Sequence, residues 1–296
     1  MPLSNPVKAD LLLLLTTLLA GAGWIFSKES LAGLTPLLFM GLRFTASGLI
    51  LVAMDSRSLT RLTRAQWQTA FPVGLFFGCI MIFWVLGLHL ANYISVGAFL
   101  FSLGIVIVPL LGPLFGEKPH RWVFFSLPFV VAGLACLSLD SEFVIGAGEL
   151  CFLAAAFFMA LFFILNGRAS TRLPTLPLTA IQLLMAGVIT FTASAFTETW
   201  NLDQPWSIWG WFVASVLLAT TLRFSIQTRA QGMAPASHGA IIMTLEPVWA
   251  ALLAVWWLGE NMTLLQVSGC ALIFAAMLVN RWPAVRYWMR SMRETR

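Results

Sequence analysis

Charged residues are scarce in this sequence. Of its 296 residues, 59% are hydrophobic and only 10% carry a charge, whereas about 25% of residues are charged in an average soluble protein. The interior of a soluble domain cannot hide so much apolar surface. The composition therefore excludes a soluble globular protein and predicts that most of the chain lies in a lipid bilayer.

Clustered metal ligands and phosphate-binding motifs are also missing. The four cysteines, Cys79, Cys136, Cys151 and Cys270, lie far apart in apolar runs, and the three histidines are scattered. This spacing excludes the usual zinc motifs and argues against a membrane enzyme, which needs grouped His, Asp or Glu side chains. The sequence contains no G-x-x-x-x-G-K-[ST] loop, which argues against an ATPase. We therefore expect neither a metal nor a cofactor.

Ten long apolar runs divide the chain. Each is close to the 20 or so residues that a helix needs to cross the hydrocarbon core, and none alternates as a barrel strand does. The runs are 10–27, 36–54, 67–88, 92–115, 121–139, 146–165, 176–197, 206–228, 235–258 and 263–280. They predict an all-α integral membrane protein with ten transmembrane helices. The first run also resembles a signal peptide, but we expect it to be retained as a span because the repeat described below requires it.

Positive charge lies almost entirely on one side of these spans. On the side of the N-terminus are Lys8, Arg57, Arg61, Arg64, Lys118, Arg121, Arg168, Arg172, Arg229, Arg281, Arg286, Arg290, Arg293 and Arg296, whereas Lys28 is on the other. This asymmetry predicts that both termini are cytoplasmic, in what we expect to be a bacterial inner membrane. The net charge of +5 thus reflects membrane topology and not nucleic-acid binding.

Two parts of the sequence echo each other. The segments "FSLGIVIVPLLGPLFGE" (101–117) and "TLEPVWAALLAVWWLGE" (244–260) both end an apolar run in Gly-Glu, 143 residues apart. Arg43 and Gly48 correspond to Gln182 and Gly187 at a spacing of 139. Because residue identity is low, chance is the alternative explanation.

A true repeat has a structural consequence. It divides the chain into residues 1–142 and 143–296, each with five spans. An odd number of spans makes the second half run through the membrane in the opposite direction. Inverted repeats are typical of secondary transporters, in which a central cavity between the halves holds the substrate near the midplane.

One long segment resembles a known family. The stretch "QTRAQGMAPASHGAIIMTLEPVWAALLAVWWLGE", from Gln227, and the apolar span after it resemble the second repeat of EamA-type permeases in the drug/metabolite transporter superfamily. The resemblance implies two inverted five-helix bundles, a cavity lined mainly by helices one, three, four, six, eight and nine, and transport of small metabolites, often export of amino acids. The chain departs from the family pattern in two places. The first half has Leu103-Gly104 where the second half has Glu246-Pro247. The first span has its tryptophan at Trp24, whereas the family pattern places one near Ala20. These departures bear on the cavity's chemistry.

Three ionisable residues lie deep within spans: Arg43, Arg223 and Glu246. Such residues are costly in a bilayer and therefore indicate functional sites. Glu246 is predicted either to couple protons or bind a substrate ammonium, or, beside the helix break at Pro247, to accept hydrogen bonds from a neighbouring helix or pair with an arginine. Arg223 either faces the cavity or extends to the cytoplasmic interface. Arg43 either binds a substrate carboxylate or holds helices together.

Neutral polar and aromatic residues complete the predicted substrate cavity. They are Trp24, Trp84, Asn92, Ser102, Asn166 and Gln227. The alternatives are ordinary helix packing for the tryptophans and bonds to their own backbone for the hydroxyl groups. Pro109, Gly112 and Pro113 predict a kink in the fourth span, and Pro247 predicts one in the ninth.

These patterns favour a secondary transporter that moves a small metabolite, an amino acid or a related amphipathic compound, out of the cell by alternating access. Its partners are then the substrate, the lipid bilayer and, if transport is coupled, protons. The main alternative is a permease for drugs or organic cations. A membrane enzyme and a channel are less well supported, since the sequence lacks both a catalytic cluster and charged pore rings.

Overall fold

The computed structural model describes residues 5–90, 94–138, 146–258 and 262–282, and every regular element within them is helical. The first half contains α1 (Asn5–Ser30), α2 (Pro36–Met54), α3 (Ser56–Thr60), α4 (Arg64–Leu90), α5 (Ile94–Ser102), α6 (Gly104–Leu111), η1 (Gly112–Phe115) and α7 (Arg121–Ser138). The second half contains α8 (Ala147–Ser170), α9 (Thr175–Thr197), α10 (Trp206–Val216), η2 (Leu217–Leu222), α11 (Arg223–Gln231), α12 (Ala236–Met243), α13 (Leu245–Leu258) and α14 (Leu264–Asn280).

Nine helical spans in the described residues are long and apolar enough to cross a membrane. Three of these are composite: α5, α6 and η1 form one, α10, η2 and α11 a second, and α12 with α13 a third. The last apolar helix, α14, has 17 residues and falls just short of the other spans. The helical fold class is therefore confirmed, with nine full-length spans, and the tenth span stays a prediction.

The helices form a bundle with an apolar exterior. Large hydrophobic side chains are exposed along its flanks, among them Phe196, Trp206 and Leu264, each more than 80% exposed. Such exposure is unfavourable in water but expected where lipid is the solvent. Together with the spans, it identifies an integral membrane protein.

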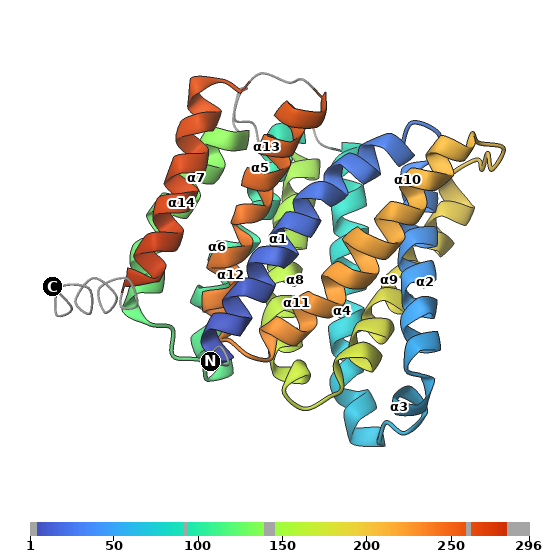
Figure 1. The fold of residues 1–296 in the computed structure, drawn as a ribbon, viewed down its shortest axis with the longest axis horizontal. Helices are drawn as coiled ribbons and strands as arrows, with labels where there is room; N and C mark the ends of the chain where they lie inside the picture. The colour runs from blue at the N-terminus through green and yellow to red at the C-terminus, as the bar shows by residue number, and fades with distance from the viewer. Residues whose placement is uncertain (1–4, 91–93, 139–145, 259–261, 283–296) are drawn as a thin grey trace, which may run out of the picture.

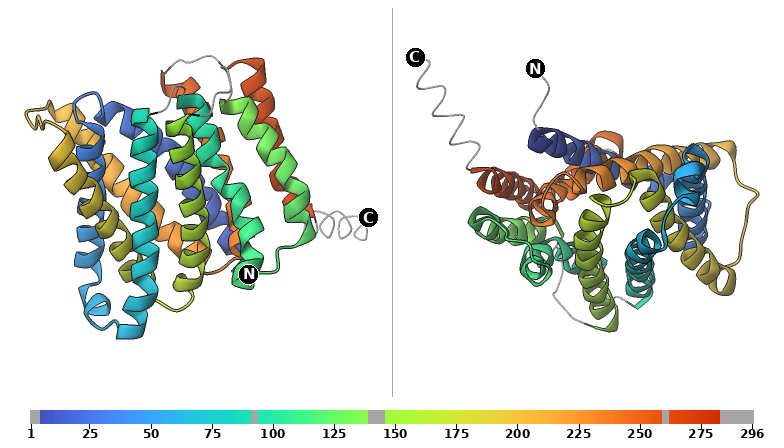
Figure 2. Two further views of the ribbon diagram at one scale, coloured as in Figure 1. Left: turned by 180° about the vertical axis from the view of Figure 1, so that it is seen from behind. Right: turned by 90° about the horizontal axis from the view of Figure 1, so that it is seen from below.

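The helices pack in pairs that join the two halves. The closest pairs are α2 with α9, α4 with α8, and α7 with α14, while α1 packs against α13 and runs beside α10 and α11 (Figure 1). Seen from behind, α4, α8 and the α5–α6 span stand side by side (Figure 2). The core thus consists of contacts between the halves.

Gly48 and Gly187, which echo each other in the sequence, both lie in the α2–α9 contact. A Cβ atom on Gly48 would lie 2.6 Å from Leu184, and one on Gly187 would lie 2.4 Å from Thr45. Small residues let membrane helices approach this closely. The two glycines therefore allow a close approach between the halves.

Two spans are broken where kinks were predicted. The fourth span breaks at Leu103, beside Gly104, and turns into the 3-10 helix η1 at Gly112, beside Pro113. The ninth span breaks at Thr244, because Pro247 has no amide proton and its ring crowds the carbonyl group of Met243. Both predictions of a break are confirmed.

A third interruption was not predicted. The eighth span contains the π-helical segment η2 between α10 and α11, without a proline. Short π-helical segments within α-helices often lie at functional sites. Two of the predicted site residues, Arg43 and Arg223, contact or adjoin this segment.

Candidate substrate site

Arg43 is held by hydrogen bonds from all three of its side-chain nitrogens. Nε donates to the hydroxyl group of Thr220, Nη1 donates to Ser27 Oγ at 3.0 Å, and Nη2 donates to the carbonyl oxygen of Ala219 at 3.2 Å. These partners lie on α1 and η2, whereas Arg43 lies on α2. The side chain therefore ties three spans together in the interior.

The π-helix explains how Arg43 finds these partners. A π-turn bonds residue i to residue i+5 and so leaves carbonyl groups available to other donors. Thr220 Oγ1 donates to the Ser215 carbonyl at 2.9 Å, and Ser47 Oγ on α2 donates to the Val216 carbonyl at 3.2 Å. The widened turn at η2 thus provides acceptors for the polar side chains of α2.

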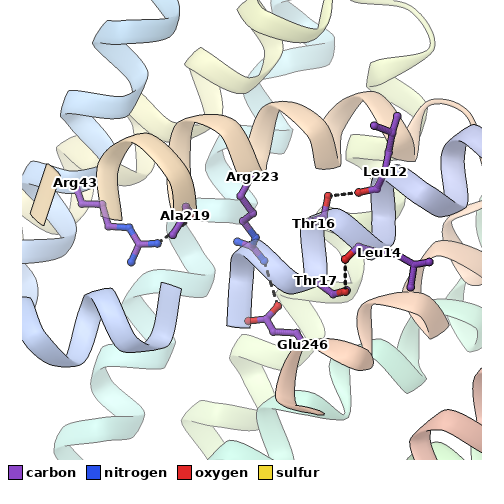
Figure 3. A network of polar contacts seen from close by, with 8 residues as sticks. All are labelled: Leu12, Leu14, Thr16, Thr17, Arg43, Ala219, Arg223 and Glu246. Carbon is purple, nitrogen blue, oxygen red and sulfur yellow. Dashed lines mark hydrogen bonds and ion pairs between the residues drawn. The ribbon is translucent and has the colours of Figure 1, made fainter. Parts of the chain in front are cut away.

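Arg223 and Glu246 form an ion pair between α11 and α13. Arg223 Nη2 lies 3.3 Å from Glu246 Oε2, with side chains only 16% and 28% exposed (Figure 3). Arg223 also stacks over the Phe224 ring, 4.3 Å from its centroid. Arg43 lies close enough to interact with both charges. Arg43, Arg223 and Glu246 together carry a formal charge of +1.

Several buried polar atoms beside this pair lack a hydrogen-bond partner in the described part of the chain. They are Arg223 Nε, Gln227 Oε1, Thr221 Oγ1 and Trp249 Nε1. Gln227 follows Arg223 by one helical turn and Trp249 follows Glu246 by almost one, so each pair shares a helix face. Because Arg223 contacts Glu246, these two faces meet. They present unused donors and an unused acceptor at the ion pair.

The first helix encloses this region from one side. A Cβ atom on Gly21 would lie 2.6 Å from Trp249 Cβ, and one on Gly23 would lie 2.8 Å from Ala219 Cβ. The backbone of α1 therefore passes in direct contact with both α13 and η2. The run "AGAG" at 20–23 allows this approach, which a larger side chain would prevent.

Asn166 lies in a different polar cluster. It is 1% exposed on α8, accepts a hydrogen bond from Gln182 on α9 at 2.5 Å, and donates to Gln231 and, at 3.5 Å, to Thr228 on α11. Its amide oxygen and nitrogen are therefore both used within the protein. The cluster joins three helices, and a contact between Asn166 and substrate stays a prediction.

Three other predicted residues, Ser102, Trp84 and Trp24, make no hydrogen bond to Arg223 or Glu246 within the described residues. Ser102 donates to the Ala98 carbonyl of its own helix at 2.8 Å. Trp84 is half-buried against an apolar cluster, and Trp24 is 56% exposed. Asn92 lies outside the described residues. Of the predicted residues, the structure pairs Arg223 with Glu246. We take this pair, with Gln227 one turn after Arg223 and the buried Arg43, as the candidate site.

Two further carboxylates, which the sequence did not single out as functional, cap helices of the other half. Glu198, after α9, accepts hydrogen bonds from the Leu37 and Leu38 amides of α2 at 2.9 and 2.8 Å, and from the Thr35 and Ser194 hydroxyl groups at 2.7 Å. Burial acts to raise the pKa of Glu198, but these four bonds outweigh it and lower that pKa from its ordinary value of 4.5.

Glu117, after η1, makes the second of these caps. It accepts hydrogen bonds from the Ala236 amide at 3.0 Å and the Ser237 amide at 3.4 Å, at the start of α12. The sequence marks both helix starts with a proline, Pro36 for α2 and Pro235 for α12. In the structure, the residue that precedes each helix, Thr35 or Pro235, makes no side-chain capping bond to that helix.

A groove of about 160 Å³ lies elsewhere, between α2, α4 and α9. Its lining is apolar and includes Met81, Val85 and Ile189. None of the predicted site residues lines it. The polar site and this groove are therefore separate features.

Comparisons with known proteins identify the family of this chain. The model of the "EamA-like transporter family" matches the chain twice, over residues 7–139 and 146–282. The "Uncharacterized transporter YvbV" of Bacillus subtilis (strain 168) is 27% identical over 287 residues, which cover 92% of each chain. The "Probable amino-acid metabolite efflux pump" of Salmonella typhimurium (strain LT2) is 26% identical over 295 residues, covering 92% of this chain and 94% of that one.

One solved structure, titled only "Crystal structure of protein", has the same fold. It superposes with a TM-score of 0.82 at 20% identity and covers 95% of this chain and 99% of its own. At this identity the likeness concerns the fold alone. The two family matches span nearly the whole sequence, and the chain therefore belongs to the EamA-like transporter family.

Proposed function

We propose that this protein exports a small zwitterionic metabolite, an amino acid or a close relative, across the bacterial cytoplasmic membrane by alternating access. The observation that carries the proposal is the Arg223–Glu246 pair, with unpartnered polar atoms beside it in the membrane interior. The name of the Salmonella relative supports the same substrate class.

The chemistry of these groups suits a zwitterion. The Nε–H of Arg223 and the indole N–H of Trp249 are donors, and two donors suit a carboxylate. The carboxylate of Glu246 and the amide oxygen of Gln227 are acceptors that suit an ammonium group. A bound zwitterion would supply the partners that these buried atoms lack, and so recover part of the cost of burying them.

Several features support two inverted five-helix repeats, residues 1–142 and 143–296, around a central cavity. The family model matches once in each half. Spans five positions apart pack together, as α2 does with α9 and α7 with α14. The fourth and ninth spans, which correspond in the two halves, are both broken near the middle. Matched breaks of this kind point to a site between repeats.

The orientation follows from charge. The face on which α1 begins carries most of the arginine and lysine residues, so we assign it to the cytoplasm. Asp10, Glu117, His238 and Asn280 lie at this end of the bundle, which we call the N-terminal face. Glu198 and Thr35 lie at the other end, which we call the opposite face.

Efflux of organic cations is the alternative. Two guanidinium groups against one carboxylate give the site a formal positive charge, which disfavours a substrate that carries only positive charge. The matched family and both relatives are described as transporters, which favours transport over enzymatic activity.

A counterflow assay with purified protein in liposomes tests the proposal. We expect accumulation of one or more labelled amino acids and none of amines, nucleosides or cationic dyes. Arg223→Ala and Glu246→Gln should each reduce the rate at least 10-fold, whereas the exposed Arg229→Ala and Asp203→Asn should not. Counterflow of cationic dyes alone would overturn the proposal.

The same liposomes decide whether protons drive transport. If Glu246 carries the coupling proton, Glu246→Gln abolishes uphill movement in a pH gradient while the variant still folds. Uphill transport that survives this substitution excludes Glu246 as the proton carrier. If the unmodified protein equilibrates the substrate at the same rate with and without a pH gradient, it is a facilitator.

A further inference from the structure

A second group of titratable residues lies at the N-terminal face, away from the Arg223–Glu246 pair. His238, in the first turn of α12, has partners at both ring nitrogens. Nε2 lies 3.1 Å from Asp10 Oδ1 on α1, and Nδ1 lies 3.0 Å from Asn280 Nδ2 at the end of α14. Asp10 also pairs with Arg281 through its second oxygen. Three spans therefore meet at one histidine.

These contacts select one protonation state. The amide nitrogen of Asn280 is a donor, so His238 Nδ1 accepts, and the ring proton resides on Nε2 and points to Asp10. This is the neutral imidazole. A second proton on Nδ1 would face the donor of Asn280, which is 7% exposed and packed among its neighbours. Protonation therefore opposes the contact between α12 and α14.

The same helix turn is the one that Glu117 caps. Glu117 accepts hydrogen bonds from Ala236 and Ser237, the two residues directly before His238. Glu117 and Asp10 belong to the first half of the chain, and His238 belongs to the second. The first turn of α12 thus holds the two halves together at this face, and we call its contacts with Glu117, Asp10 and Asn280 the inner gate.

The other charged groups around α12 are accounted for. At the same face, Arg121 of α7 stacks on Trp122, and Arg168 of α8 stacks on Phe115. The helix α6 carries no titratable side chain. Glu246 of α13 lies further along the span and pairs with Arg223. Asp10 contacts the imidazole directly, Arg281 pairs with Asp10, and Glu117 binds the two amides before His238. Lys8, two residues before Asp10 on α1, is exposed.

We propose that His238 is a proton-binding site that controls the inner gate. In the neutral form it accepts from Asn280 and donates to Asp10, and the gate stays closed. Uptake of a proton from the N-terminal side removes the acceptor at Nδ1 and releases α14 from α12, while the imidazolium keeps its contact with Asp10 on α1. Histidine is the side chain whose charge changes most readily within the physiological pH range, so the site can respond to cytoplasmic acidification.

This site differs from Glu246 in position and role. Glu246 would carry a proton with the substrate, whereas His238 would set how readily one face opens. The description of the site as a gate rests on the proposed transport function, but proton binding itself does not. A test without substrate therefore separates the two.

Hydrogen–deuterium exchange of residues 236–243 in detergent-purified protein provides that test. Labelling times are scaled for the pH dependence of intrinsic exchange. We expect at least 3-fold faster exchange at pH 5.5 than at pH 7.5. His238→Gln, which keeps one donor and one acceptor but cannot titrate, should make the two rates equal. His120→Gln, an exposed histidine on the same face, is the matched control and should retain the difference.

A second variant keeps the test decisive if His238→Gln folds poorly. Asn280→Asp places a carboxylate against Nδ1, favours the protonated ring, and should shift the midpoint of the transition upward by about 1–2 pH units. A purely structural role for the cluster would lower stability without moving that midpoint. Equal exchange at both pH values in the unmodified protein, or an unchanged difference in His238→Gln, would overturn the proposal.

Discussion

Glu198 and Glu117 cap helices at opposite faces of the bundle, and each belongs to one half of the chain while its helix belongs to the other. Glu198 accepts four hydrogen bonds between 2.7 and 2.9 Å. Glu117 accepts two, at 3.0 and 3.4 Å. Carboxylates that accept amide and hydroxyl protons at short distances are strong caps. The opposite face is therefore held more firmly than the N-terminal face.

The helices at the two faces also differ in how firmly they are packed. Glu198 ties the end of α9 to the start of α2, a pair in close contact along most of its length. Glu117 ties the end of η1 to α12, a helix of only 8 residues that breaks at Thr244. A short helix with a break beside it moves at lower cost than a continuous packed pair. We therefore expect the N-terminal face to open more readily than the opposite face.

The largest effect is expected from Glu198→Ala. It leaves the amides of Leu37 and Leu38 and two hydroxyl groups without their acceptor, which should cost about 2–3 kcal/mol of stability. Thermal unfolding in detergent measures this loss. Asp203→Ala, an exposed acid in the following loop, is the control. Equal shifts in the two variants would show that the cap at Glu198 contributes nothing.

Acid should weaken the same cap. The pKa of Glu198 is lower in the folded protein than its ordinary value of 4.5, so its contribution is complete above about pH 4.5 and is lost as the pH falls through the folded pKa. We expect the unfolding temperature to fall more steeply below pH 4.5 in the unmodified protein than in Glu198→Gln. Parallel curves would contradict this. Because a histidine and a carboxylate titrate in different pH ranges, the two faces should respond to pH separately.

Glu117→Ala should cost less stability, about 1 kcal/mol, because two longer hydrogen bonds are lost. It should nevertheless accelerate hydrogen exchange in residues 236–243 at neutral pH, since the first turn of α12 loses its cap. Exchange in residues 36–43 of α2 is the internal control. A loss of stability as large as that in Glu198→Ala would remove the difference between the faces.

Thr35→Ala should have the smallest effect. It removes one of the four hydrogen bonds to Glu198, a contribution of about 0.5–1 kcal/mol, and leaves both amide bonds of the cap intact. Thermal unfolding beside Glu198→Ala measures the fraction. If Thr35→Ala is as destabilising as Glu198→Ala, the cap depends on the hydroxyl group and not on the amides.

Nine of the spans and the breaks in the fourth and ninth spans were predictable, because hydrophobic length and proline chemistry are local properties of the sequence. An arginine partner for Glu246 was one of the predicted alternatives, but which arginine it would be was not predictable, since Arg223 lies 23 residues away on another helix. The contacts of Arg43 were not predictable either, because they need the π-helical turn at 217–222, which no proline or glycine marks. Glu117 and Glu198 looked like ordinary residues at span ends. Their role depends on which helix start lies opposite, a property of the packed bundle.

The predicted substrate residues show the same limit: their chemistry was predictable, but their partners in the packed bundle were not. Arg223 and Glu246 stood out because charge is rare in a membrane interior, and the structure brings them together. Asn166 had the right chemistry, but its amide group is occupied by Gln182, Thr228 and Gln231. Residue type alone does not distinguish a polar group that awaits a ligand from one that joins helices.

The most direct test of the central claim is counterflow with three related compounds: an amino acid, the amine that lacks its carboxylate, and the acid that lacks its ammonium group. The unmodified protein should prefer the amino acid. Arg223→Gln should abolish discrimination against the amine, and Glu246→Gln should abolish discrimination against the acid. If both variants keep the original order of preference, Arg223 and Glu246 do not recognise the substrate, and the proposed site is wrong.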